Sequence, residues 1–573
     1  MTPKRFLTVT VALLVAGSLA APALANDLPN WVEEAPAWKA FSPLQPSIAR
    51  RPAVLLETSY YVYGPNTGFD NVEVNITVSD RNYDDPVSLY LYWQDRENLS
   101  DVRYYNMPAG GFVNSERDLF GQSSTPVAVL TPDLTDFQLF GPSGAFGDVP
   151  NNIPTGVGRY QFVFEVRSAN GNQVIARGNA MYNQVSGVNQ VGGTVTTSQV
   201  WDSDTVIFMA SPTNFDGGAT LTIEPGTVIL GSQSGQGTLV IRQGATINAE
   251  GTEDLPIIFT SELPVGQRGA GDWGGLVING NAPTNQQNPQ GEGDSGPFGG
   301  NNANDSSGVL KYVRVEFAGI RFSDQNELNG IALQGVGAGT TIEKIQVHFN
   351  QDDGIEFFGG TVNAKYVLIT DAQDDSLDWT FGWTGKLQHF VAIQRFNEHD
   401  HGIEADNFED NPSATPRSNP TIYNATFYGN GNVNNAENDD GWRLRRGTQL
   451  TIGHSIVTNF AQFGLVTDGD NPADWSGVSI TNSFFYNNTN GLTNSPEAQA
   501  ILDAGNNFID VNARIPNGNG TIGVDYSLLN SSDARNVGAT PPNDGFFDQV
   551  NYAGGVAPND PWIHEGWTTF SDN

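Results

Sequence analysis

The amino-acid sequence predicts an all-β protein, in which an immunoglobulin-like β-sandwich is followed by a right-handed parallel β-helix, a solenoid of stacked coils. Three observations support this prediction. Glycine is frequent, with 65 residues among 573, and apolar runs are short and separated by turn residues. Helical periodicity is nearly absent. An acidic motif also recurs at intervals that match the coils of a solenoid.

The composition excludes several classes of protein. The chain has 63 acidic against 27 basic side chains and a net charge of −36, so we expect no binding to nucleic acid, whose phosphates would repel it. It has no cysteine, which excludes disulfides, thiolate zinc sites and iron–sulfur clusters.

The N-terminal residues 1–25 have the features of a secretory signal peptide. Lys4 and Arg5 precede an apolar run, and a small-x-small cleavage site follows at 23–25. The apolar run is too short for a membrane span, and no later stretch is long enough. We therefore expect a protein that is secreted or held at the cell surface and does not span a membrane.

Residues 50–186 predict the β-sandwich, after an N-terminal extension at 26–49. Strictly alternating strands occur at 72–78, 87–93 and 160–166. The spacing of the strand patterns fits about seven strands, the number found in an immunoglobulin-like sandwich. This architecture alone implies no activity.

Residues 192–510 predict the β-helix, and 511–573 predict a loop-rich C-terminal cap. Short apolar strands are separated by glycine turns, as in 220–230 and 238–248. Strands this short must stack on neighbouring coils to bury their apolar faces. A β-propeller is the second choice, because each blade needs four strands and a longer repeat. The insertion at 281–307, rich in Asn, Gly and Gln, is expected to leave the coil.

An acidic motif repeats four times within this region. Two polar residues, mostly aspartates, precede a small residue and a short strand at 352–356, 374–378, 400–404 and 439–443. The second copy begins 22 residues after the first, which fits one coil of a three-sided β-helix. The longer intervals between later copies leave room for loops.

The strands of this motif predict a column of charged side chains on one outer face. If Ile355 and its equivalents point inward, Glu356 and its equivalents must point outward. Strands of neighbouring coils lie about 4.8 Å apart, so stacked carboxylates repel one another. Calcium, which binds about 6–8 oxygen ligands, is the expected compensating ion. Its predicted ligands are Asp352, Asp353, Glu356, Asp374, Asp375, Asp378, Asp400, Glu404, Asp439 and Asp440.

Two other interpretations of the acidic motif stay open. Aspartate beside glycine also builds turns without any metal. Alternatively the motif belongs to a catalytic site, with His401, Arg443 and Arg445 as candidate residues. The set is superficially similar to that of polygalacturonases but lacks their Asn-Thr-Asp and Arg-x-Lys motifs. Candidate side chains for stacking on sugars or capping the coil are Trp379, Trp383, Trp475, Trp562 and Trp567.

Two segments carry a resemblance to a known family. The Gly-Asp-Trp-Gly-Gly motif within 271–280 and the segment 251–261 are similar to a large family of secreted bacterial parallel β-helix proteins. The resemblance extends over about 192–486 and implies fold and export rather than an activity. The overall profile is also similar to surface-layer and biofilm-matrix proteins of marine gammaproteobacteria.

These observations together predict an exported structural protein. We expect it to self-associate into a surface layer or an extracellular biofilm matrix, with calcium as a stabilising ion. An enzyme is the less favoured interpretation, namely a calcium-dependent polysaccharide lyase or a glycoside hydrolase acting on acidic polysaccharide. A carbohydrate-binding adhesin is the third, and its partner would be a cell-surface or extracellular polysaccharide.

Overall fold

The computed structural model describes most of residues 174–570, together with the strands between 53 and 168 and parts of their connections. After residue 174 the gaps in this description are 264–265, 324–325, 396–398, 432–438, 469–474, 516–525, 530 and 559–561. The expected signal peptide lies outside the described residues, and among those residues no helix could cross a membrane. Contacts divide the chain into two compact units, one built on Met1–Ser186 and the other on Gly187–Thr521 with Tyr526–Thr568.

The first unit contains two β-sheets. One has the strand order β1-β3-β8, and the other has the order β2-β10-β9-β4-β5-β6, with β7 beside β4. The bounds are β1 Ala53–Thr58, β2 Val62–Tyr63, β3 Val74–Ser79, β4 Pro86–Asp95, β5 Val102–Asn106, β6 Gly111–Val113, β7 Ala128–Val129, β8 Phe137–Phe140, β9 Gly158–Ser168 and β10 Val174–Gln184. The three alternating strands expected from the sequence lie in β3, β4 and β9. The immunoglobulin-like topology stays a prediction, because many connections lie outside the described residues.

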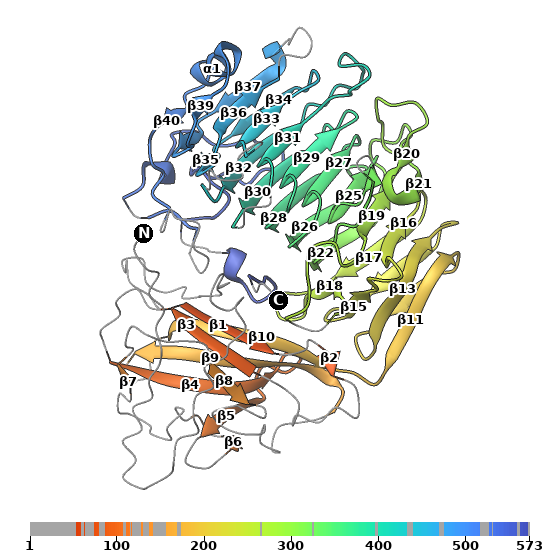
Figure 1. Ribbon diagram of the computed structural model, residues 1–573, viewed down its shortest axis with the longest axis vertical. Coiled ribbons are helices and arrows are strands. Elements are labelled where there is room, and N and C mark those ends of the chain that lie inside the picture. The colour runs from red at the N-terminus through yellow and green to blue at the C-terminus, as the bar shows by residue number, and fades with distance from the viewer. Residues whose placement is uncertain are drawn as a thin grey trace. The chain divides into compact units, whose positions relative to one another are not determined.

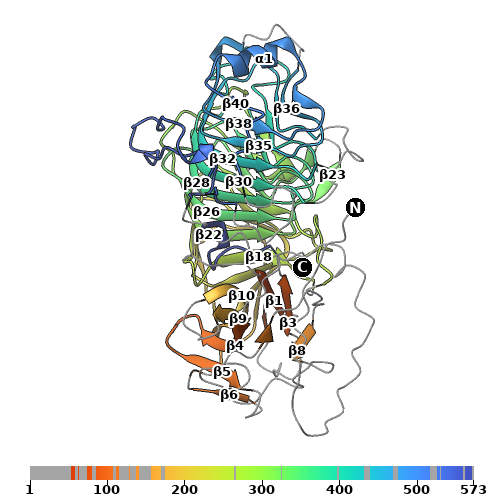
Figure 2. The ribbon, with the colours of Figure 1, turned by 90° about the vertical axis from the view of Figure 1, so that its left-hand side faces the viewer.

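A parallel β-helix forms the second unit, as the sequence predicts (Figure 1). Its 26 strands make one continuous sheet in which each strand pairs in parallel with its equivalent in the next coil. Figure 2 shows one side of this stack, where β22, β26, β28, β30 and β32 lie side by side. The handedness of the coil stays a prediction.

The strands fall into three columns, one for each side of the coil. One side, called here the site column, consists of β16 Thr238–Ile241, β19 Gly275–Asn279, β25 Ile331–Gln334, β27 Ile355–Phe358, β29 Leu377–Thr380, β31 Ile403–Ala405, β33 Trp442–Leu444, β36 Phe463–Thr467 and β39 Gly491–Thr493. Five long strands span the other two sides: β22 Gly308–Glu316, β26 Thr341–His348, β28 Asn363–Thr370, β30 Lys386–Ile393 and β32 Thr421–Tyr428. The remaining strands of the coil are β11 Val188–Val195, β12 Gln199–Trp201, β13 Val206–Phe215, β14 Thr220–Ile223, β15 Val228–Gly231, β17 Thr246–Glu250, β18 Ile257–Ser261, β34 Leu450–Gly453, β35 Ile456–Thr458, β37 Val478–Thr481, β38 Phe484–Tyr486 and β40 Phe508–Ile509.

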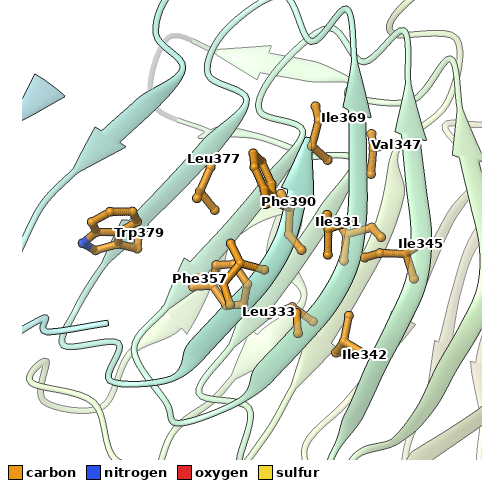
Figure 3. Close-up of a cluster of buried hydrophobic side chains, with 14 of the residues drawn as sticks. Ile331, Leu333, Ile342, Ile345, Val347, Phe357, Ile369, Leu377, Trp379 and Phe390 are labelled. Atoms are coloured by element: carbon orange, nitrogen blue, oxygen red, sulfur yellow. The ribbon is translucent and has the colours of Figure 1, made fainter. Parts of the chain in front are cut away.

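The interior of the coil is a continuous apolar core. Alternate residues of each strand point into it, and Figure 3 shows Leu333, Phe357 and Leu377 among the buried side chains of successive coils. The inward position of Leu377 continues with Ile403 and Trp442 in the next two coils. Burial of apolar surface stabilises the fold by about 25 cal/mol per Å². Because each strand is short, this gain depends on the neighbouring coils.

Each long strand turns a corner of the coil at one residue with positive φ. The equivalent residues in successive coils are Tyr312, Lys344, Tyr366, His389 and Asn424, with φ between 49° and 58°. This conformation costs a non-glycine residue about 1–2 kcal/mol. Side-chain stacking along the corner offsets part of the cost: the rings of Tyr366 and His389 are stacked 4.6 Å apart.

Two C-terminal elements cover parts of the coil. Helix α1, Pro496–Asp503, begins at the N-cap Ser495 and adds Ala498, Ile501 and Leu502 to the core cluster. Residues 526–568 pack along the long strands, where Lys365 Nζ lies 2.9 Å from Asp548 Oδ1. The remaining short elements are β20 Gln290–Gly291, β21 Gly296–Pro297, β23 Arg321–Ser323 and β24 Asn326–Glu327, with 3-10 turns at Glu292–Asp294, Trp475–Gly477, Asp533–Arg535 and Trp562–His564.

Candidate functional site

The charged column predicted from the acidic motif is present on the outer face of the site column. Glu356 pairs in register with Asp378, Asp378 with Glu404, and Glu404 with Arg443. Each of these side chains follows an inward-facing apolar residue, so the alternation of the strand directs the charged groups outward. Before Glu356 the equivalent outward position is Ala332, so the charged part of the face begins at β27.

Eight carboxylates lie close together on and beside β27, β29 and β31 of this face. Groups of three have ligand oxygens that all lie within 4.8 Å of one another, and the groups overlap. Together they make up what we call the acidic cluster: Glu327, Asp352, Asp353, Glu356, Asp374, Asp375, Asp378 and Glu404. The predicted ligands Asp400, Asp439 and Asp440 are not in these groups. Glu327 was missed, because a hairpin outside the repeat, β23 and β24, supplies it.

The second aspartate of the motif also joins one coil to the next. Asp353 Oδ1 accepts a hydrogen bond of 3.0 Å from the backbone N–H of Asp375. Asp375 Oδ1 accepts one of 2.7 Å from the N–H of His401, and Asp440 Oδ1 one of 2.9 Å from the N–H of Phe463. The aspartates of the motif therefore stabilise the β-helix in addition to forming the acidic cluster, since these hydrogen bonds hold successive coils in register.

Burial raises the pKa values of the clustered carboxyl groups, and their mutual repulsion raises them further. The pKa of Asp352 is raised to about 9, and those of Asp374 and Glu404 to about 7. Glu292, from the insertion that flanks the cluster, has a pKa raised to about 8. The pKa values of four more deeply buried groups are raised well above their usual range: Asp353, Glu356, Asp375 and Asp378. At neutral pH the cluster therefore needs either bound protons or a bound cation.

The donor chemistry of the cluster suits a hard divalent cation. All the charged ligands are carboxylate oxygens, which Ca²⁺ and Mg²⁺ prefer over nitrogen or sulfur. Asp378 Oδ1 is buried and accepts no hydrogen bond from any described residue. Asn329, which is 1% exposed, donates from Nδ2 to Glu356 Oε2 at 2.7 Å. Its Oδ1 atom is also without a partner among the described residues and offers a neutral oxygen beside the carboxylates. The acidic cluster can therefore hold a metal ion.

Three arginines continue the same face beyond Glu404. Arg445 forms two hydrogen bonds of 2.9 Å with the carboxylate of Asp406 and also contacts Glu404. Arg446 Nη1 donates to Asp406 Oδ2 at 2.5 Å. Arg443 is 26% exposed and contacts Asp468 Oδ2 at 2.8 Å. Over two coils the face thus changes from carboxylates alone to carboxylates paired with arginines.

His401, a predicted candidate catalytic residue, lies beneath this basic group. Its side chain is 1% exposed, and Nε2 accepts a hydrogen bond of 3.0 Å from Arg443 Nη1. Its Nδ1 atom lies 3.9 Å from Asp440 Oδ2. A side chain this deeply buried positions Arg443 rather than contacting a polymer itself. Asp439 contacts the other nearby histidine, with 3.5 Å between Asp439 Oδ1 and His399 Nδ1.

The insertion at 281–307 leaves the coil, as expected, and covers the apolar part of the face. Its Phe298 packs with Leu328 and Phe358 in a separate buried cluster. Asn285 of the insertion donates to Asn407 Oδ1 at 2.8 Å, which ties it to the loop after β31. The insertion therefore buries the apolar part of the face and reaches the edge of the charged part, where Glu292 accepts a hydrogen bond of 3.4 Å from Asn329 Nδ2.

Four of the five tryptophans singled out as sugar-stacking candidates are buried and not available for that role. Trp379, Trp383, Trp562 and Trp567 are all at most 1% exposed. Trp475 is partly buried against the core of the coil. The sequence shows which segments contain aromatic residues, but only the tertiary structure shows which of these side chains point into the core.

The sequence of the β-helix matches one family directly. Residues 193–526 match the family described as a pectate-lyase-like β-helix domain, which covers more than half of the chain. This protein belongs to the pectate-lyase-like β-helix family. Among curated proteins, none matches the chain.

The solved structures that match this pectate-lyase-like protein are distant from it. The catalytic unit of a GH87 α-1,3-glucanase from Streptomyces thermodiastaticus is 12% identical over 83% of this chain and 94% of its own, with a TM-score of 0.31. Pectate lyase Pel3 from Pectobacterium carotovorum is 10% identical over 77% and 91%, with a TM-score of 0.14. A family 28 exopolygalacturonase from Yersinia enterocolitica is 12% identical over 80% and 97%, with a TM-score of 0.18.

The main functional prediction from the sequence is wrong. A structural protein of a surface layer or biofilm matrix is contradicted by membership of the pectate-lyase-like β-helix family. The error arose because a rigid acidic solenoid without a familiar catalytic motif suits a structural protein equally well. The family match favours the alternative interpretation, an enzyme, over the structural one.

Proposed function

We propose that this protein is a secreted, calcium-dependent enzyme that cleaves an acidic polysaccharide on the outer face of β27, β29, β31 and β33. One observation carries the proposal: on a single face of a pectate-lyase-like β-helix, a carboxylate cluster suited to a cation lies directly beside Arg443, Arg445 and Arg446. Export is supported by the signal-peptide features of residues 1–25.

The charge pattern suits an anionic polymer only when a cation is present. Without a cation the face would repel a polyuronate, because its carboxylates carry the same charge as the polymer and its arginines are already paired with carboxylates. Calcium in the acidic cluster would neutralise these carboxylates and leave its open coordination positions to a substrate carboxylate. Arg443 and Arg445, whose guanidinium groups are held by Asp468 and Asp406, are placed to bind the next carboxylate along the polymer.

Elimination is the reaction that this arrangement supports best. Bound calcium would polarise the uronate carboxylate and so acidify the neighbouring C–H group. Glu404, with a pKa raised to about 7 and 3.9 Å from Arg443, would take up the C–H proton as its carboxylate, and Arg443 would bind the same sugar and stabilise the negative charge that develops. The C–O bond to the next sugar then breaks, its oxygen leaves with the electron pair and takes up a proton, and a C=C bond remains.

Hydrolysis is a second candidate, and one observation favours it. Glu404, with a pKa raised to about 7, lies near Asp406, whose carboxylate is held by two arginines. A carboxyl group with a raised pKa beside a second carboxyl group is what glycoside hydrolysis requires. In that case water would add across the broken bond, and no C=C bond would form.

The test is a product assay with pectate, alginate and a neutral α-glucan as substrates. Elimination predicts a calcium-dependent rise in ultraviolet absorbance from the unsaturated product, whereas hydrolysis predicts reducing ends without that absorbance. Arg443→Ala should abolish either signal, and Arg242→Ala, a matched arginine variant in the first coils, should not. Folded protein with bound calcium that releases neither product from any of the three polymers would contradict the proposal.

A further inference from the structure

Two half-exposed phenylalanines lie beside the charged face, outside the residues used above. Phe381 follows β29, and Phe408 lies in the loop after β31. Their ring centroids are 5.3 Å apart and their planes meet at 82°. They continue a line of aromatic rings from the insertion, since Phe358 lies 6.1 Å from Phe381 and is itself buried against Phe298. Only the last two rings of the line are partly open to solvent.

The backbone around this aromatic pair is held firmly. Phe381 N–H donates to Asn407 O at 2.8 Å, and Asn285 N–H donates to Phe381 O at 2.9 Å. Asn407 is fully buried, and its Nδ2 donates to Pro412 O and Ala414 O, both at 3.1 Å. The rings therefore need little ordering when a ligand binds, which lowers the entropic cost of binding.

The aromatic pair adjoins the basic end of the charged face. Asp406, which binds Arg445 and Arg446, is two residues before Phe408. Arg446 is 31% exposed and reaches Glu409, the residue after Phe408, at 3.4 Å. The Arg446 guanidinium is thus bound to Asp406 and Glu409, the residues that flank Asn407 and Phe408 in this loop. A uronate sugar has matching features, because its C–H groups form an apolar face and its carboxylate projects from the ring edge.

We infer that Phe381 and Phe408 form a sugar subsite that binds a uronate residue of the polymer away from the bond that is cleaved, with the ring on Phe408 and the carboxylate near Arg446. This inference rests on the proposed function for the identity of the polymer. It assigns these two phenylalanines to substrate binding and leaves the bond-breaking step to the acidic cluster and Arg443.

The test measures binding and turnover separately in the full chain. Retardation in gels that contain pectate or alginate, with calcium, gives relative affinities for wild type and variants. Phe408→Ala should weaken binding about fivefold to tenfold, the size of one lost aromatic contact, and Phe408→Tyr should retain it. Phe208→Ala, which removes a half-buried phenylalanine from the first coils, is the matched control and should bind as wild type does. Phe408→Leu should bind as weakly as Phe408→Ala while keeping the thermal midpoint closer to that of wild type.

The outcomes separate the subsite from the proposed reaction. Wild type that binds a polymer without cleaving it contradicts the reaction, while loss of binding in Phe408→Ala would still support the subsite. Equal binding by wild type, Phe408→Ala and Phe381→Ala overturns the subsite and leaves the reaction untouched. If neither polymer retards the wild-type protein, the inferred subsite and the assignment of a uronate polymer as its ligand are both contradicted.

Discussion

Asp375 Oδ1 accepts a hydrogen bond of 2.7 Å from the backbone N–H of His401, the residue at the equivalent position one coil later. Asp375 also belongs to the acidic cluster, so one carboxylate both joins two coils and faces its charged neighbours. The same arrangement occurs one coil earlier, between Asp353 and Asp375. The acidic motif is thus a structural element of the β-helix that also carries the negative charge of the candidate site.

Replacing Asp375 should separate these two roles. Asp375→Asn keeps an oxygen for the His401 N–H and removes the cost of protonating this carboxyl group on folding, so in chelator at neutral pH the free energy of unfolding should rise, by about 1 kcal/mol or more. Asp375→Ala loses the acceptor as well and should be less stable than Asp375→Asn by about 1–3 kcal/mol. Urea denaturation of both variants measures this. A lower free energy of unfolding for Asp375→Asn in chelator would show that the Asp375 carboxyl group does not destabilise the folded state.

Calcium should stabilise the folded protein through the acidic cluster. An ion that binds only the native state at a hundred times its Kd adds about 2.7 kcal/mol to the free energy of unfolding. Calorimetry after chelation should therefore give a lower thermal midpoint, restored by calcium but not by sodium at equal ionic strength. Asp378→Asn should weaken the effect, and Asp503→Asn in α1 should not. An unchanged midpoint after chelation would count against a cation in the cluster.

Without a divalent cation, stability should fall as pH rises. Carboxyl groups with raised folded-state pKa values bind more protons in the native state, so stability is fully present below about pH 4, the unfolded pKa, and is lost as pH rises through the folded values. The pH range over which stability is lost extends to about pH 7 for Asp374 and Glu404 and to about pH 9 for Asp352. Urea midpoints measured in chelator from pH 5 to 9 test the sign, with a slope of about 1.4 kcal/mol per pH unit for each proton released. Saturating calcium should reduce this dependence of stability on pH. A urea midpoint that rises with pH in chelator would contradict the predicted loss of stability.

His401 should act on the substrate only through Arg443. His401→Gln retains a side-chain acceptor for the Arg443 guanidinium, whereas His401→Ala removes it. We expect kcat on the cleaved polymer to fall about tenfold or more in His401→Ala, because small misplacement of a binding group is costly, and to recover in part in His401→Gln. Steady-state kinetics gives kcat and KM for each variant. Loss of all activity in both variants, with folding intact, would instead indicate a direct catalytic role for the imidazole.

Asp548 should help to hold the C-terminal segment on the coil. It accepts from Lys365 Nζ at 2.9 Å and lies 3.1 Å from His389 Nε2, and these contacts lower its pKa below the usual range. A lowered carboxyl pKa contributes stability above about pH 4 that is lost as pH falls. Because the side chain is 45% exposed, we expect Asp548→Asn to cost only about 1 kcal/mol at neutral pH. Thermal melts at pH 7 and pH 3 should show the difference between variant and wild type shrinking at the lower pH.

The fold of the β-helix and the register of its charged column could be predicted from the sequence. The acidic motif recurs once per coil, and in a strand the side chains alternate, so Ile355 inward requires Glu356 outward. Pairing of Glu356, Asp378, Glu404 and Arg443 follows from aligning the copies of that motif. These features depend only on local pattern and on the regular spacing of coils.

The remaining parts of the site depend on contacts between segments far apart in the chain. Glu327 and Glu292 reach the acidic cluster from a hairpin and an insertion that share no repeat with it, and periodicity says nothing about where such excursions return. The burial of an aromatic side chain also depends on such long-range contacts. Trp379 faces inward and is 0% exposed, whereas Phe381, two residues later and beyond the end of the strand, is partly exposed. The sequence by itself determined the repeat and the alternation, because both are properties of neighbouring residues. Only the tertiary structure decided which charges meet and which rings stay exposed, because burial depends on the loops that pack over each coil.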